Sequence, residues 1–143
     1  PILDQNSNII SAVTLGMDIT EQVKRREQLK ESETRFRIIA NALPMIVWTA
    51  TPEFRVNWYS DWWYNYIGLT VGTTWDDASA QPMHPEDVEK TKIALVEAIR
   101  RQDKFEMEQR LRRGSDGEYR WHLVRGVAVK DDLGNIIKWV GAT

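Results

Sequence analysis

The sequence predicts an α+β domain in which a five-stranded antiparallel sheet carries its helices on one face and follows a long helix. Apolar and polar residues alternate along segments that turn residues separate, and the segments run in the order strand, strand, helices, then three strands. A polar turn followed by an apolar strand also occurs twice. The repeat rests on four residues in register: Asp4, Asn8, Ile9 and Ile10 match Asp131, Asn135, Ile136 and Ile137.

The repeat predicts how the chain is organised. Because only the end of the unit recurs, we expect residues 1–20 to be the last strand of a preceding domain, with residues 21–43 a linker helix and 44–143 a second copy of the domain. The strand at residues 8–15 has no expected partner upstream. A tandem array of this kind favours a sensor-like module over a lone enzyme.

Composition narrows the function further. The chain has 143 residues and a net charge of −2, which argues against nucleic acid as a partner. It has no cysteine, so it can form no disulfide, thiolate nucleophile or cysteine-ligated zinc site. No apolar run is long enough to cross a membrane. The expected location is the cytoplasm, within a longer protein that could itself be membrane-anchored.

The linker helix is predicted from a cap and from an uninterrupted polar run. Thr20 can cap a helix over residues 21–42, in which no glycine or proline occurs. Leu29, Phe36 and Leu43 follow one another at a spacing of seven and form a narrow apolar seam. Two interpretations stay open: the helix docks on its own domain, or it forms a short parallel coiled coil with a second copy.

The first half of the domain is predicted from turn and cap residues. The expected elements are a strand over residues 45–51, a strand over 55–59, a helix over 62–67 capped by Ser60 or Asp61 and closed by Gly68, an irregular segment over 71–81 with one helical turn, and a helix over 85–101. His84, Pro85, Glu86 and Asp87 are typical of a helix start, because proline suits the first position and acids suit the first turn. A metal site at His84 is the less favoured alternative.

The last three strands show the clearest alternation. Phe105, Met107, Gln109 and Leu111 alternate with charged residues. Residues 114–117 form a turn, residues 119–129 a long return strand, residues 131–134 another turn and residues 136–142 the last strand. Arginines and glutamates are interleaved here, which favours cross-strand ion pairs over a nucleic-acid surface.

Three motifs resemble a known family. They are Trp63-Tyr64-Asn65-Tyr66-Ile67-Gly68, Met83-His84-Pro85-Glu86-Asp87, and the run from Arg110 through Gly114-Ser115-Asp116-Gly117 to Trp121. In this order the chain resembles the PAS domain with its C-terminal PAC part over residues 43–143. It departs at Pro52-Glu53-Phe54, where many relatives have Asp-Gly. The resemblance implies a regulatory module of sensor histidine kinases, cyclic-di-nucleotide enzymes or transcription regulators. It also implies a ligand pocket between sheet and helices, and dimers formed through the outer sheet face and the preceding helix.

The resemblance also implies where a pocket would lie. By analogy with flavin-binding PAS domains, His122 faces the cavity together with Val124 and Gly126, while Tyr119 and Trp121 face outward. The expected pocket residues are Trp48, Met107, Gln109, His122, Val124 and Trp139. Two questions stay open: whether His122 bonds a ligand or is satisfied by Gln109 or a backbone group, and whether the tryptophans line a cavity or fill it.

Since the residues offer no catalytic signature, the function that we expect is the binding of a ligand. The two histidines lie in no catalytic signature, so the expected function is a sensor module that binds a small ligand or relays conformational change to an output domain. The alternative is a ligand-free dimerisation module with a packed core. The cofactor is unknown: light-driven flavin adducts need a cysteine, and haem is disfavoured because the helix over residues 85–101 has no histidine. Expected partners are a second copy, adjacent PAS and output domains, and a small molecule.

Overall fold

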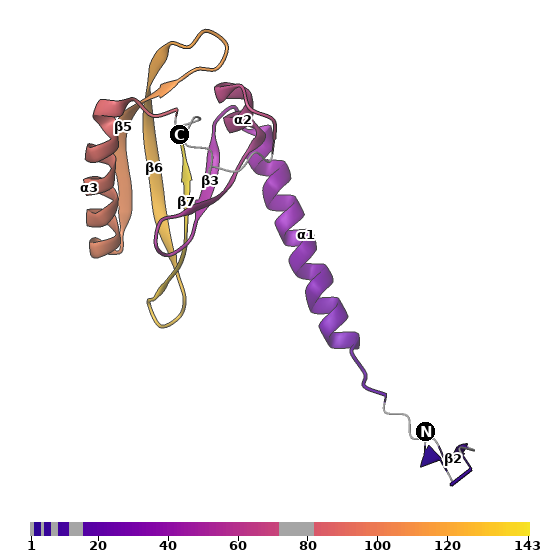
Figure 1. Cartoon of the computed structure of the whole chain (residues 1–143). Coiled ribbons are helices and arrows are strands. Elements are labelled where there is room, and N and C mark those ends of the chain that lie inside the picture. The colour runs from indigo at the N-terminus through magenta and orange to yellow at the C-terminus, as the bar shows by residue number, and fades with distance from the viewer. Residues whose placement is uncertain (1, 4, 7–8, 12–15, 72–81) are drawn as a thin grey trace. The chain divides into compact units, whose positions relative to one another are not determined.

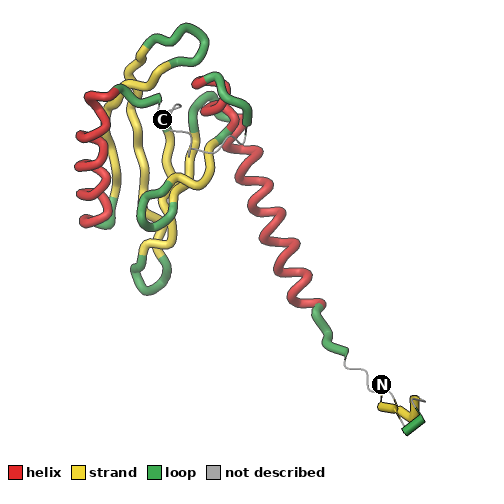
Figure 2. The backbone as a smooth tube through the Cα atoms, in the orientation of Figure 1, coloured by secondary structure: helices red, strands yellow, loops and turns green. Residues whose placement is uncertain are grey.

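The computed structural model describes residues 2–3, 5–6, 9–11, 16–71 and 82–143. The chain divides into two compact units, Pro1–Phe36 and Arg37–Thr143, and each is described by itself. Figure 1 labels the helices and strands, and Figure 2 shows how they alternate with turns. The helical turn expected near residues 75–80 lies outside the described residues.

The first unit holds a short strand pair and most of a long helix. β1 (Ile2–Leu3) pairs antiparallel with β2 (Ile9–Ser11), so the expectation that this strand has no partner upstream is wrong. A turn at residues 5–6 lies between the two strands and allows the chain to reverse. α1 (Thr20–Ala42) begins one residue earlier than expected, because the Asp18 carboxylate accepts hydrogen bonds from the backbone N–H and the hydroxyl of Thr20, at 2.9 and 2.6 Å.

The second unit is built on a five-stranded antiparallel sheet in the order β4-β3-β7-β6-β5. Its strands are β3 (Val47–Ala50), β4 (Val56–Tyr59), β5 (Lys104–Arg112), β6 (Tyr119–Lys130) and β7 (Ile136–Ala142). α2 (Asp61–Ile67) follows β4, and α3 (Pro85–Arg101) precedes β5 and lies along it (Figure 1). The predicted α+β class and the number of strands are confirmed.

Strand register places Trp121 and His122 on opposite faces, as predicted. β6 pairs with β5 so that His122 lies opposite Gln109 and Val124 lies opposite Met107. Val124 is buried, whereas Trp121 is 66% exposed. Because successive side chains of a strand point to opposite faces, Gln109, His122 and Val124 share the inner face and Trp121 lies on the outer face.

Hydrogen bonds to two other elements hold the start of α2 in place. Ser60 precedes the helix, but its hydroxyl accepts from the N–H of Val47 at 3.0 Å instead of capping α2. The N–H of Asp61 donates to the side-chain oxygen of Asn41 in α1 at 2.9 Å. Gly68 ends the helix with a φ of 76°, as its place in the motif predicted. The start of α2 is therefore tied both to β3 and to the end of α1.

α3 begins where the histidine-proline motif predicted. Pro85 is its first residue, and Nδ1 of His84 accepts a hydrogen bond from the N–H of Glu86 at 3.2 Å. The interpretation of this motif as a helix start is confirmed.

A single apolar cluster joins the sheet to the helices. Phe54 enters it from the β3–β4 turn, where it adopts a φ of 62°, which is uncommon for a residue other than glycine. Its ring centroid lies 4.8 Å from that of Trp139, 5.2 Å from Phe105 and 5.6 Å from Trp48. Burial of this ring stabilises a turn for which the sequence supplies no glycine. The buried members of the cluster are Ile46, Trp48, Ala50, Trp63, Ala98, Phe105, Leu111, Val124 and Trp139.

Candidate functional site

A cavity of about 420 Å³ lies among the inner sheet face, α2, α3 and the segment just before α3. Its size falls toward the lower end of the roughly 300–1,000 Å³ typical of small-molecule pockets. Five rings line it: Trp48, Phe54, Tyr59, Trp63 and Phe105. Four residues with polar side chains join them: Thr91, Lys92, Gln109 and Thr143. The site is thus a mostly apolar pocket with a few polar groups.

Two glycines of the sheet make room for the indole of Trp48. A Cβ atom added at Gly126 would lie 2.6 Å from Cη2 of that ring, and one added at Gly141 would lie 2.2 Å from Cζ2. Both distances are well below ordinary carbon contacts of about 3.5–4.0 Å. The ring therefore packs directly over the backbone of β6 and β7, and its indole N–H donates to the Thr143 hydroxyl at 3.3 Å.

Three of the six predicted pocket residues line this cavity, namely Trp48, Gln109 and Val124. Met107, His122 and Trp139 are not among its lining residues. Trp139 is fully buried in the cluster, where its indole N–H donates to the carbonyl of Pro52 at 3.2 Å. Met107 is half-buried and packs against the same cluster.

His122 lies on the predicted face but is engaged away from the cavity. Its ring contacts Tyr66 of α2 edge-on, with centroids 4.8 Å apart. Its Nδ1 lies 2.8 Å from the carbonyl oxygen of Arg120. Because a carbonyl can only accept, Nδ1 carries the proton of this hydrogen bond. A backbone group thus satisfies His122, one of the two alternatives that the sequence left open.

Several lining residues were not predicted from the sequence. Phe54 and Trp63 come from a turn and from the short helix, where no periodic pattern marks an inward side chain. Thr91 and Leu95 come from α3, and Met83 from the segment before it. The apolar residues of α3 recur at helical spacing, which was the one available signal for Leu95.

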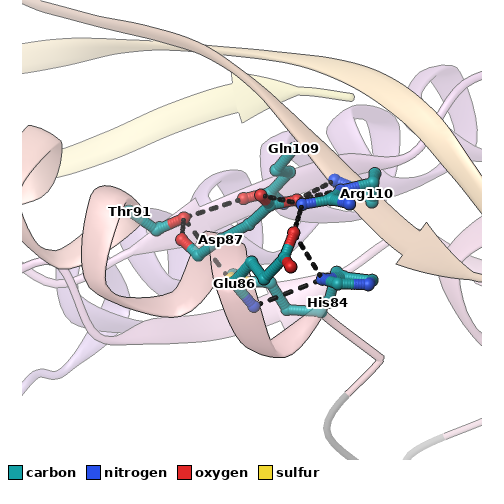
Figure 3. Close-up of polar contacts among 7 residues, drawn as sticks. His84, Glu86, Asp87, Thr91, Gln109 and Arg110 are labelled. Carbon is teal, nitrogen blue, oxygen red and sulfur yellow. Dashed lines mark hydrogen bonds and ion pairs between the residues drawn. The ribbon is translucent and has the colours of Figure 1, made fainter.

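A polar network beside the cavity joins α3 to β5 (Figure 3). The Asp87 carboxylate accepts from the backbone N–H of Arg110 at 2.8 Å and from its guanidinium at 2.9 and 2.8 Å. Glu86 accepts from the same guanidinium at 2.9 Å. On the other side, the guanidinium carbon of Arg110 lies 5.0 Å from the ring centroid of Trp121. Arg110 therefore reaches from the start of α3 to the outer face of the sheet.

The charges of this network are mutually stabilised. The hydrogen bonds from Arg110 hold the pKa of the Asp87 carboxyl well below its usual range, although burial opposes this. The same bonds raise the pKa of the Arg110 guanidinium. Both groups therefore stay ionised at neutral pH and fix the start of α3 against the edge strand.

Within the described ranges, no group of three or more histidine, aspartate or glutamate side chains could hold a metal ion. For the same ranges, no helix combines the length and apolar character needed to cross a bilayer.

The chain matches the model of a known protein family. The family model described as the PAS fold matches residues 56–143. The chain belongs to the PAS fold family. The match begins at β4 and includes α3 and the last three strands. β3, the strand just before the match, completes the sheet of this PAS domain.

Similar proteins point to signalling. An uncharacterized protein of Sinorhizobium fredii is 30% identical over 100 residues, which cover 70% of this chain and 12% of that protein. A peroxide stress-activated histidine kinase of Schizosaccharomyces pombe is 26% identical over 156 residues, which cover 99% of this chain and 10% of the kinase. The chain thus spans only 10–12% of the length of these curated relatives.

A solved structure shows the same fold. A sensory box histidine kinase/response regulator from Burkholderia thailandensis matches with a TM-score of 0.55 at 24% identity, covering 76% of this chain and 81% of that chain. This likeness shows the fold, and the family match together with the similar histidine kinase supports a regulatory sensor role for the PAS domain.

Proposed function

We propose that this PAS domain is the sensor module of a larger signalling protein, and that the cavity binds the small molecule that it senses. The observation that carries the proposal is a cavity of about 420 Å³ beneath α3 with five rings in its walls. Pockets that hold small molecules are concave, mostly apolar and lined by aromatic side chains together with a few polar groups. The size and the lining of this cavity fit that description.

The walls suit binding more than catalysis. Of the described residues that line the cavity, only Lys92 is charged, and it is exposed. Burial raises the pKa of the Tyr59 hydroxyl, so this group is neutral at physiological pH. We therefore assign any kinase or cyclase activity of a full-length protein to other domains. A cytoplasmic location of the domain is a separate part of the proposal.

The proposal extends to a homodimer formed through α1 and the outer sheet face. Leu29 and Phe36 of α1, and Leu43 directly after its end, make up the predicted seam, and all three are exposed in the single chain. On the outer face of the sheet Trp121 and Val127 are exposed as well. Exposed apolar surface of this kind marks interaction sites in soluble proteins. A second copy would cover these residues, and adjacent domains of the same chain would extend the array.

Contacts at the end of α1 offer a route from the cavity to the linker helix. The side chain of Asn41 accepts from the N–H of Asp61 at 2.9 Å and donates to its carboxylate at 3.0 Å. Asp61 begins α2, and Trp63 of this helix lines the cavity. A ligand that displaces Trp63 would therefore move the residue to which α1 is bonded. The coupling needed between the two sites is typically about 1–3 kcal/mol.

A cavity-filling variant tests the sensing site. Leu95 lines the cavity, whereas its neighbour Val96 is exposed, so Leu95→Trp and Val96→Trp are a matched pair. Native mass spectrometry of the purified chain, followed by thermal-shift titration with naphthalene, measures what the cavity holds. We expect binding in the wild type and in Val96→Trp, and its loss in Leu95→Trp. No retained molecule and no thermal shift in the wild type would favour the ligand-free dimerisation module instead.

A further inference from the structure

The polar edge of the cavity is formed by one buried carboxamide. Resting on the proposed sensing role, we infer that the cavity binds an uncharged, flat aromatic compound whose edge presents a hydrogen-bond donor beside an acceptor, and that Gln109 recognises this edge. Three features of the cavity support this ligand: the hydrogen bonds of the Gln109 side chain, the rigidity of β5, and the lack of buried charge among the described residues that line the cavity.

Gln109 has hydrogen-bonding capacity that the described residues do not use. It is only 9% exposed and lines the cavity. Among the described residues its single hydrogen-bond contact is a long one, 3.4 Å from Oε1 to the Thr91 hydroxyl (Figure 3). That hydroxyl has one proton, which the carbonyl of Asp87 accepts at 2.8 Å. Within the described ranges the N–H donors of the carboxamide thus have no partner, and its acceptor oxygen has only this long contact.

A cavity-lining amide in this state is suited to bind a ligand. Buried polar side chains are nearly always hydrogen-bonded, and an unpaired one costs free energy. A side-chain carboxamide forms two parallel hydrogen bonds with an edge that carries a donor beside an acceptor, as glutamine does with the edge of adenine. The Gln109 carboxamide is therefore complementary to a lactam or to an amino-substituted heterocycle.

The backbone holds this carboxamide in place. Gln109 pairs with His122 in the β5–β6 ladder. The next residue, Arg110, donates its N–H to Asp87 at 2.8 Å and accepts from the N–H of His84 at 2.9 Å. Bonds on both edges of β5 keep the strand from shifting, so the amide is presented from a rigid element.

The remaining walls select for a flat and uncharged compound. Trp48, Phe54, Trp63 and Phe105 offer ring faces and edges, which favour stacked or edge-on aromatic contacts. None of the described residues that line the cavity is acidic, and the one basic residue among them, Lys92, is exposed, with its Nζ 3.8 Å from a carboxylate oxygen of Glu89. A buried ligand charge would find no partner among these residues and would be costly to desolvate. The size of the cavity suits a compound of one or two rings.

Two closely matched probes test the inference. Carbostyril is a two-ring lactam with an N–H beside a carbonyl, and N-methylcarbostyril lacks only that N–H donor. We expect isothermal titration calorimetry to show that the wild-type chain prefers carbostyril by at least about tenfold, the scale of a good paired contact. Gln109→Leu should reduce the preference to below about twofold, because leucine fills similar space without polar atoms. Thr91→Val should retain it, since the carboxamide is unchanged.

The outcomes separate this inference from the proposed function. Equal affinity for the two probes, or a preference that survives Gln109→Leu, would overturn the role of Gln109 and leave the sensing cavity intact. Binding of naphthalene without binding of carbostyril would overturn the ligand class alone. If neither compound binds, the inference and the proposed sensing site both fail. A shift of the Gln109 side-chain amide resonance on addition of carbostyril would support the contact directly.

Discussion

Gly126 offers a direct test of how the floor of the cavity is built. The change is Gly126→Ala, made alone and together with Trp48→Phe. The added Cβ would stand 2.6 Å from Cη2 and 3.2 Å from Cζ2 of the Trp48 indole. Carbon atoms in contact prefer about 3.5–4.0 Å, so the ring must retreat by about 1 Å. It is 3% exposed and packed against Phe54, so the room available for this retreat is the cavity itself.

The expected cost follows from two opposing terms. Overpacking a core costs about 1–3 kcal/mol, whereas replacing glycine by alanine inside a strand recovers about 0.5–1 kcal/mol of backbone entropy. The net loss for Gly126→Ala is therefore about 0–2.5 kcal/mol. Trp48→Phe removes the ring atoms that Cβ would meet. In that background Gly126→Ala should be neutral or stabilising, with a coupling of about 1–3 kcal/mol between the two sites.

Urea unfolding of the four proteins, followed by circular dichroism, measures the cycle. Naphthalene binding measured on the same samples should weaken in Gly126→Ala, because the displaced ring enters the cavity. Additive effects of the two substitutions within about 0.5 kcal/mol would refute the reasoning, since the predicted contact would then not exist.

Three further predictions concern packing, charge and assembly. Gly114→Ala should lower the free energy of unfolding measured in urea by about 1–3 kcal/mol, because the added Cβ would meet a backbone oxygen of α2 at 2.3 Å. The control Gly117→Ala has open space around the added Cβ but a φ of 76°, so it should cost only about 1 kcal/mol. Equal losses in the two variants would contradict this prediction. Asp87→Asn should lower the melting temperature at neutral pH, with a difference that shrinks below pH of about 4. The pKa of Asp87 is lowered in the fold, so its ionised form stabilises above the unfolded-state pKa and this stability is lost as pH falls; a pH-independent difference would count against the ion pair. Trp121→Ala should weaken dimerisation by about 2–4 kcal/mol in sedimentation experiments, and a wild type that stays monomeric throughout would exclude the dimer.

Much of the fold was open to prediction because its signals are local. Phe105, Met107, Gln109 and Leu111 alternate with charged residues, and this period of two fixes which side chains share a face. The same rule placed Val124 inward and Trp121 outward. Pro85 and the acids after it marked the start of α3, because the geometry of a helix end depends on only a few neighbouring residues.

The candidate site was predicted only in part, because its contacts join distant segments. Trp48, Gln109 and Val124 line the cavity as expected, but His122 turns to Tyr66 and Trp139 is closed off beneath Phe54. Whether an inward side chain reaches a cavity depends on the bulk of what packs over it, and no pattern along one strand contains that information.

The sequence by itself determined the class of fold, the order of its strands and helices, and the face on which each residue of β5 and β6 lies. All of these follow from periodicity, caps and turns, whose physical range is a few residues. Only the tertiary structure decided that Trp48 lies over Gly126 and Gly141, and that Gln109 keeps a carboxamide with spare hydrogen-bonding capacity. Both results depend on volume and on competition for hydrogen bonds among groups far apart in the chain, and these are settled only when all the segments pack together.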